Sequence, residues 1–138
     1  MSIATCPSTF PYLKSNFVQR LTIKEKIMLM LSLAVFTLVA VMGAGMGIDA
    51  FKGRGSPRLY ALIHGGLALL GSILVILVAL KGDTRLYVII GLALIIIAAG
   101  LYISFQRAKG IQPRALILLH GGTAVTCYGL LAYYALRG

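Results

Sequence analysis

Four long runs of apolar residues constrain the fold of this chain more than any other feature of its sequence. They cover residues 27–48, 59–80, 86–105 and 115–136, and none has proline, lysine, arginine, aspartate or glutamate in its interior. Each has about 20 residues, and a helix of that length crosses the roughly 30 Å hydrocarbon core of a bilayer. Because lipid offers the backbone no hydrogen-bonding partner, each run is expected to form a membrane-spanning helix.

The composition excludes several classes of protein. Of the 138 residues, 59% are hydrophobic and only 12% are charged, whereas a soluble domain has roughly 25% charged residues. The only acids are Glu25, Asp49 and Asp83. This leaves no carboxylate pair and no acidic metal cage, so we identify no catalytic residues and expect no catalytic activity of the chain on its own.

The net charge of +10 does not indicate a nucleic-acid partner. Lysine and arginine fall in short clusters between the apolar runs, and they form no basic stripe interleaved with aromatic residues. This pattern is typical of cations that meet lipid headgroups at the ends of membrane spans. We therefore expect a multi-pass protein of an inner or plasma membrane, with charges too evenly divided between the two sides to assign an orientation.

The connections between the runs are short, so consecutive helices should pack antiparallel. The expected fold is an all-α integral membrane four-helix bundle with up-down-up-down order. Thr22 and Glu25 have the spacing of a capping box before the first run. Ser56 stands as a cap before a proline in the first turn of the second helix. Asp83 is expected to cap the third helix, and Pro113 is expected to start the fourth.

Residues 1–26 form an N-terminal tail that differs from the four-span domain at 27–138. Its apolar residues recur at near-helical spacing, and its lysine and arginine lie off that face. The residues of this face are Phe10, Leu13, Phe17, Val18 and Leu21. The pattern predicts either an amphipathic helix on the membrane surface or a contact for a partner subunit, and a disordered polar tail is the alternative.

The second and fourth runs match each other without gaps at a spacing of 56 residues. The triplet His64-Gly65-Gly66 matches His120-Gly121-Gly122, and Pro57-Arg58 matches Pro113-Arg114. The first and third runs match only in the depth of their small residues. The sequence therefore predicts two tandem duplicated helical hairpins, related by a pseudo-twofold axis along the membrane normal. The hairpins cover residues of about 27–82 and 83–138.

His64 and His120 are the only histidines and the only strongly ionisable residues inside the runs. Ionisable residues within a membrane mark functional sites. In a ring of four antiparallel helices the second and fourth lie diagonally opposite, so the two imidazoles should face each other at one depth. Both would lie about 9 Å from the starts of their helices. Two facing imidazoles can ligate the iron of one haem b, and these residues are the candidate metal ligands.

A haem also requires small residues at that depth and cations near its propionates. Glycines stand at the matching depth of the first and third runs and beside both histidines, and an arginine begins each histidine-bearing run. The candidate cofactor-binding residues are therefore His64, His120, Gly43, Gly45, Gly65, Gly100, Gly121, Arg58 and Arg114.

This arrangement is similar to that of b-type cytochromes, in which diagonal helices of a bundle hold haem through facing histidines and neighbouring helices carry glycine. The resemblance covers helix order, histidine placement and small residues. A dihaem cytochrome b has two histidines on each diagonal helix, whereas this chain has one. The resemblance therefore implies a single haem and no transmembrane electron transfer by this chain alone.

Other readings of the two histidines remain open. Neutral imidazoles can hydrogen-bond between helices and hold the bundle together, and the neighbouring glycines can serve only close helix packing. A quinone, copper or proton-handling role is a further alternative. Among single residues, Cys127 is expected to be a small apolar filler, and Tyr128 to need a hydrogen-bond partner if it is buried. Asp49 is expected either to cap a helix or to pair with Lys52.

Nearly all of the chain lies in the predicted spans, which leaves no soluble domain to bind a substrate. The sequence therefore favours a small membrane subunit of a larger complex, and the leading hypothesis is an electron-transfer complex with one haem b. The alternative is a cofactor-free structural or assembly subunit that packs against partner membrane proteins or against itself. A small transporter or an oligomeric pore is a weaker alternative.

Overall fold

The computed structural model describes residues 10–137, with side chains from residue 23 onward. Over these residues the chain forms four helices, and by length and composition all four are long and apolar enough to cross a membrane. They are α1 (Phe10–Phe51), α2 (Arg58–Ala79), α3 (Leu86–Ala108) and α4 (Arg114–Arg137). The all-helical prediction is confirmed.

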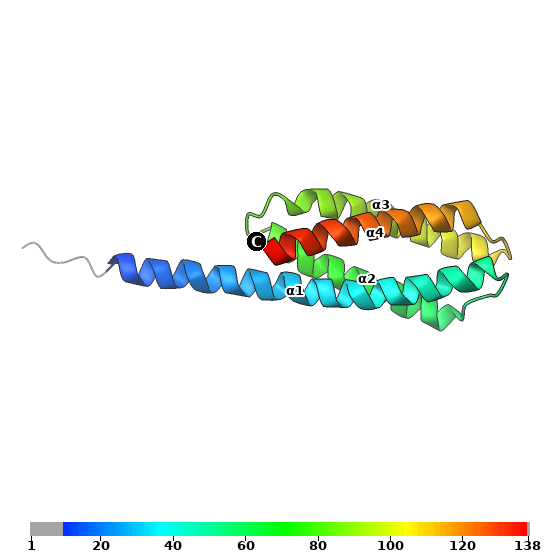
Figure 1. Cartoon of the computed structure of the whole chain (residues 1–138), viewed down its shortest axis with the longest axis horizontal. Coiled ribbons are helices and arrows are strands. Elements are labelled where there is room, and N and C mark those ends of the chain that lie inside the picture. The colour runs from blue at the N-terminus through cyan, green and yellow to red at the C-terminus, as the bar shows by residue number, and fades with distance from the viewer. Residues whose placement is uncertain (1–9, 138) are drawn as a thin grey trace, which may run out of the picture.

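The helices form a ring in chain order. Both α1 and α3 contact α2 and α4, whereas within the described residues α1 does not contact α3 and α2 does not contact α4. The α1–α2 and α3–α4 connections lie at one end, which we call the loop end, and the α2–α3 connection lies at the other end with the C-terminus (Figure 1). The predicted antiparallel order is confirmed, and α2 and α4 are diagonal as expected.

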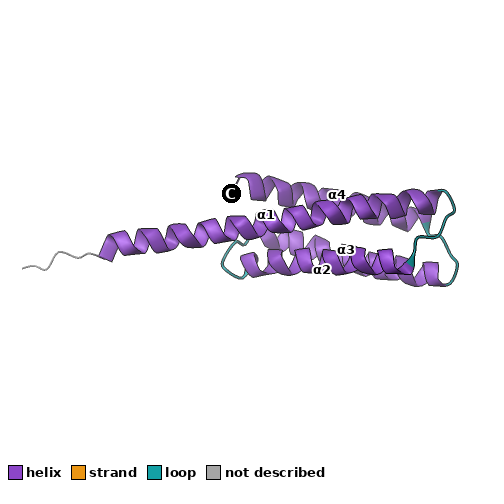
Figure 2. Ribbon diagram, turned by 90° about the horizontal axis from the view of Figure 1, so that it is seen from below, coloured by secondary structure: helices purple, strands orange, loops and turns teal. Residues whose placement is uncertain are grey.

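Helix α1 is much longer than predicted. It runs unbroken for 42 residues, about 63 Å, and its N-terminal part projects beyond the other helices (Figures 1 and 2). The predicted helix start at Thr22 and Glu25 is wrong, because both lie inside this helix, and no break separates the tail from the first span. Residues 1–9 lie outside the described residues, and so do the side chains of the predicted amphipathic face.

The starts of α2 and α4 lie one residue later than predicted. Each helix begins at arginine, so Pro57 and Pro113 precede the first turn and do not belong to it. Pro57 is extended, with φ −55° and ψ 139°, as its ring permits. Ser56 makes no capping bond to the helix; its hydroxyl instead accepts a hydrogen bond from Arg107 at 3.4 Å.

The start of α3 is held by Asp83, although not by a side-chain cap on its first residue. Arg85 precedes the helix, and its backbone N–H donates to the Asp83 carboxylate at 3.2 Å. The Arg85 guanidinium makes two further bonds to the same carboxylate, each of 2.9 Å. This paired guanidinium holds the pKa of Asp83 below its usual value.

Helices α1 and α3 end in the same turn at the loop end. Gly53 has φ 71° and Gly110 has φ 79°, a conformation that side chains disfavour. The next N–H in each turn bonds back across the helix end, with a length of 2.8 Å for Arg54 and 3.1 Å for Ile111. This is the Schellman pattern that closes a helix and reverses the chain.

The main cluster of buried residues lies in the half of the bundle away from the loop end, and the two hairpins contribute equivalent positions to it. Three of the four buried positions of α2 recur 56 residues later on α4, and two buried positions of α1 recur 57 residues later on α3. The first set pairs Gly71 with Cys127, Val75 with Leu131 and Ala79 with Ala135; the second pairs Leu29 with Leu86 and Ser32 with Ile89.

Candidate functional site

The two histidines occupy equivalent places on the diagonal helices. His64 is the seventh residue of α2 and His120 the seventh of α4, so both lie at one depth in the half of the bundle nearer the loop end. The structure therefore places the two predicted ligands at equivalent positions on diagonal helices.

The His64 ring packs directly against Gly43 of α1. A Cβ atom at Gly43 would lie 3.0 Å from the ring Cε1 and 3.7 Å from Nδ1, closer than carbon atoms normally approach. The backbone carbonyl of Val39, one turn earlier on α1, also faces the ring. Glycine at position 43 thus makes room for the imidazole itself.

The second hairpin repeats this contact. A Cβ atom at Gly100 of α3 would lie 3.2 Å from Cε1 of His120, and the backbone of Ile96 faces that ring. Val39 and Ile96 each precede their glycine by four residues, one helical turn. Each imidazole therefore lies on a glycine and faces a carbonyl of the preceding helix in its own hairpin.

Each imidazole has a ring nitrogen without a partner. Nδ1 of His64 and Nδ1 of His120 are buried and make no hydrogen bond, and the only other described side-chain atom in this condition is Oε1 of Gln112. A neutral imidazole has one donor and one acceptor nitrogen. Leaving a buried polar atom unpaired costs roughly 1–3 kcal/mol, so these two nitrogens are the candidate ligand atoms of the site.

Helices α2 and α4 are loosely packed around the histidines, although α1 buries Met42 and Ala50 in this half and α3 buries Ile103. No residue of α2 before Gly71 is buried, and none of α4 before Cys127. Both Gly65 and Gly121 have no atom within 4 Å of an added Cβ. These two glycines therefore do not make close helix contacts within the described part of the chain.

The remaining predicted residues lie farther from the rings. Gly45 faces the hydroxyl of Tyr60, which is 3.9 Å from an added Cβ. Arg58 and Arg114 begin their helices six residues before the histidines, about 9 Å along the axis. Both are exposed at the loop end, so in this structure neither contacts an imidazole.

The two imidazoles alone do not form a metal cage. No group of three or more histidine, cysteine, aspartate or glutamate side chains gathers anywhere in the described part of the chain. The protein can therefore offer a metal only two nitrogen ligands here. That number suits an iron whose other four ligands come from a porphyrin, and it is too few for an isolated zinc ion, which takes four.

Several smaller predictions are settled by the structure. Cys127 is a buried filler whose thiol lies 3.7 Å from the carbonyl of Ile89, and Tyr128 finds its expected partner in Thr37 at 2.9 Å. The predicted pairing of Asp49 with Lys52 is wrong. Asp49 pairs at 2.9 Å with Arg54, which the turn after Gly53 brings back over the helix end.

The carbonyls of Val39 and Ile96 could not be predicted from the sequence, because backbone groups leave no mark in a sequence pattern. The four-residue spacing before each glycine was the only available signal. No family model, no curated protein and no solved structure matches this chain. Its function is therefore argued from the site.

Proposed function

We propose that this chain is a four-span integral membrane protein built from two tandem duplicated hairpins. The length and apolar composition of all four helices support insertion in a membrane. The recurrence of buried positions at spacings of 56 and 57 residues supports the duplication, as do the matching turns after α1 and α3. The equivalent contacts of His64 with Gly43 and of His120 with Gly100 support it further.

Within this bundle, His64 and His120 are proposed as the axial ligands of one b-type haem. One observation carries the proposal: in the half of the bundle nearer the loop end, α2 and α4 are loosely packed around the imidazoles, and there both rings keep an unpaired Nδ1. In the other half the core is packed, and its buried hydroxyl, that of Ser32, is bonded. A haem would fill the space between α2 and α4 in the half that holds the histidines. Histidines that bind a metal through one ring nitrogen commonly have the other nitrogen fixed by a hydrogen bond to a carbonyl. Val39 and Ile96 supply such carbonyls.

A haem held by two histidines supplies one-electron transfer. The described residues include no nucleophile–base set beside the site and no acidic side chain near either histidine. The chain is therefore proposed as the electron-carrying subunit of a larger membrane complex, in which a partner performs any substrate chemistry.

The test is a visible absorption spectrum of the full chain in mild detergent, oxidised and then reduced with dithionite, after expression with added haem. A sharp reduced α-band at about one haem per chain is expected. Replacing both histidines with alanine should abolish the band while circular dichroism still shows a helical protein. A band that persists in this double variant would reject the ligand assignment.

A second candidate is a cofactor-free structural or assembly subunit. It is favoured by the carbonyls of Val39 and Ile96, since an imidazole that bonds to a neighbouring helix can hold a bundle together. Under this alternative the wild-type protein stays colourless. Replacing either histidine should then lower stability by about 0.6 kcal/mol, the average for interhelical bonds in membranes.

A further inference from the structure

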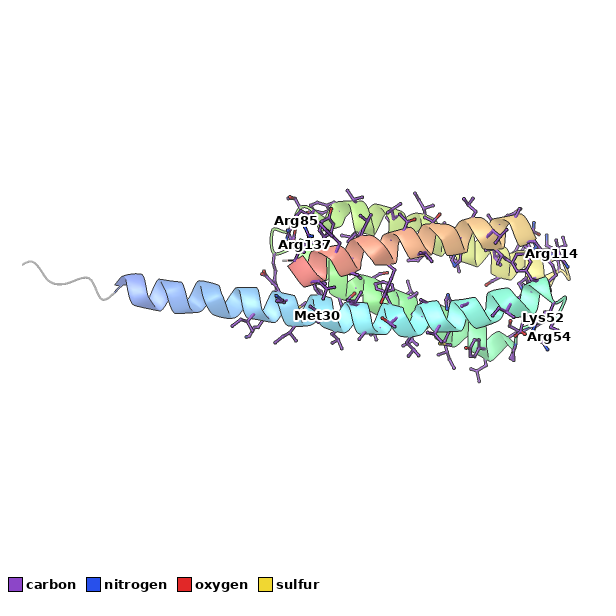
Figure 3. All side chains as sticks on the ribbon, viewed as in Figure 1. Met30, Lys52, Arg54, Arg85, Arg114 and Arg137 are labelled. Atoms are coloured by element: carbon purple, nitrogen blue, oxygen red, sulfur yellow. The ribbon has the colours of Figure 1, made fainter. Side chains whose placement is uncertain are left out.

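Cations lie at both ends of the bundle, with Arg85 and Arg137 at one end and Lys52, Arg54 and Arg114 at the other (Figure 3). Each end has several lysines and arginines and few acids among the described side chains. The loop end has Lys52, Arg54, Arg58, Arg107, Lys109 and Arg114, with Asp49 as its only acid; the opposite end has Lys24, Lys26, Lys81, Arg85 and Arg137, with Glu25 and Asp83. The two ends differ in what these cations contact.

At the opposite end most cations have partners within the chain. Arg85 pairs with Asp83 and also lies 5.6 Å from the centre of the Tyr134 ring. Arg137 lies over the ring of Tyr133 at 4.9 Å and bonds to its hydroxyl. The ammonium of Lys81 approaches the sulfur of Met28 at 3.9 Å, and Lys26 also makes an interaction.

At the loop end the charge is largely uncompensated. Asp49 neutralises only Arg54. Lys52, Arg58 and Arg114 are exposed and have no hydrogen-bond, ion-pair or aromatic partner among the described residues. The two arginines begin α2 and α4, so three unpartnered cations project from the same end of the bundle.

One contact ties the two loops of this end together. Arg107, near the end of α3, donates to the hydroxyl of Ser56, which lies just before α2. This bond joins the second hairpin to the α1–α2 connection. The unpartnered cations therefore belong to one surface and not to two separate loops.

We propose that the loop end binds anionic phospholipids, with Lys52, Arg58 and Arg114 contacting their phosphate groups. In a chain whose four helices span a bilayer, this end lies at the level of the headgroups, where phosphate oxygens are the abundant acceptors. Guanidinium groups match phosphate geometry, and each cation near an anionic membrane surface contributes to binding. The proposal does not depend on a haem.

The test compares lipid binding by two variants of equal charge. The first, K52Q/R58Q/R114Q, removes the unpartnered cations; the control, K24Q/K81Q/R137Q, removes three cations from the opposite end. Each full-length protein in neutral detergent is titrated with phosphatidylglycerol and, separately, with phosphatidylcholine. Bound lipid is counted by native mass spectrometry, and circular dichroism confirms the fold.

The wild-type protein should retain phosphatidylglycerol in preference to phosphatidylcholine. The loop-end variant should lose roughly 100-fold in affinity for phosphatidylglycerol, about fivefold for each cation, and the control should lose less than about fivefold. An equal loss in both variants, or no preference for the anionic lipid, would overturn the proposal. If the loop-end variant loses haem absorbance while its lipid binding is unchanged, these cations serve haem propionates, and the lipid proposal is equally rejected.

Discussion

The half of the bundle away from the loop end and the half that holds the histidines are built from the same four helices but packed differently. In the first half Val75, Leu86 and Leu131 are at most 1% exposed. In the second half neither α2 nor α4 buries any residue, and the glycines that follow the histidines meet no atom within 4 Å of an added Cβ. Tight packing along α2 and α4 is therefore confined to the half away from the proposed haem ligands.

Hydrogen bonding shows the same contrast. In the packed half the fully buried hydroxyl of Ser32 donates to the carbonyl of Gly71 at 3.0 Å. Thr37 donates to the carbonyl of Leu33, so the hydroxyl of Tyr128 must donate in turn to Thr37. The imidazoles, by contrast, keep unpaired nitrogens. The buried hydroxyl of the packed half is satisfied by the chain, and the described buried side-chain atoms without a partner, Nδ1 of both imidazoles and Oε1 of Gln112, all lie in the histidine half.

The largest expected effect on stability comes from adding one methyl group to the packed half. A Cβ at Gly71 would lie 3.0 Å from two atoms of the Phe36 ring, and the site is fully enclosed. Gly71→Ala should therefore destabilise the bundle by about 1–3 kcal/mol, as overpacking does in cores. Unfolding by sodium dodecyl sulfate, followed by circular dichroism, measures this loss.

Two further variants sharpen this prediction. Adding Phe36→Leu to Gly71→Ala should recover part of the lost stability, because the smaller side chain gives way to the methyl group. Gly65→Ala, in the histidine half, should leave stability unchanged, because nothing lies within 4 Å of its added Cβ. Equal losses from Gly71→Ala and Gly65→Ala would show that the two halves do not differ in packing.

A smaller effect is expected where a methyl group meets an imidazole. Gly43→Ala would press on His64 and Gly100→Ala on His120, but neither imidazole is fully buried, so each ring can shift more easily than a core side chain. Stability should fall by less than about 1 kcal/mol, while the reduced haem band should weaken or shift. The change should be greater for Gly43→Ala, whose added Cβ lies 3.0 Å from the ring against 3.2 Å for Gly100→Ala.

Gly47→Ala is the matched control for this pair, because it lies one turn from Gly43 and meets no atom within 4 Å. Its spectrum should equal that of the wild-type protein. A wild-type spectrum for Gly43→Ala as well would mean that the glycine does not position the ligand. If all variants and the wild type are colourless, nuclear magnetic resonance of the histidine ring protons gives the same comparison without haem.

Much of this arrangement could be predicted from the sequence because it follows from periodicity and spacing. The apolar runs determined the helices, and the short connections determined their antiparallel order. The repeated His-Gly-Gly triplet placed His64 and His120 at one depth on diagonal helices. Gly43 and Gly100 were expected to make room for a macrocycle, and the structure shows that they make room for the imidazoles.

Other features could not be predicted, since they depend on three-dimensional packing. The projecting part of α1 has no sequence signal that separates a continuous helix from two helices joined at Thr22. The choice of Arg54 as the partner of Asp49 depends on the conformation of the turn at Gly53. The loose packing around His64 and His120 was also hidden, because apolar runs in both halves of the bundle look alike in sequence.

A still smaller effect should distinguish the two hairpins within the packed half. Ser32 of α1 donates to the carbonyl of Gly71, whereas the equivalent bond of the second hairpin runs the other way, from Cys127 to the carbonyl of Ile89. Ser32→Ala should cost about 0.6 kcal/mol, the average for interhelical hydrogen bonds in membranes. Cys127→Ser strengthens the donor and should cost less. A larger loss of stability for Cys127→Ser than for Ser32→Ala would show that apolar packing of the Cys127 side chain, and not its hydrogen bond, determines the stability of the second hairpin.

The smallest effect is a pH dependence confined to the end of the packed half. Because the Arg85 side chain lowers the pKa of Asp83 below its usual value of 3.8, the pair stabilises the folded state above that value. This contribution is lost as the pH falls through the lower pKa of the folded protein. Thermal melting in non-ionic detergent, taken downward from about pH 5, should therefore show a fall that both Asp83→Asn and Arg85→Gln flatten. A fall that survives both substitutions would arise elsewhere, and the turn before α3 would then contribute no acid-sensitive stability to the packed half.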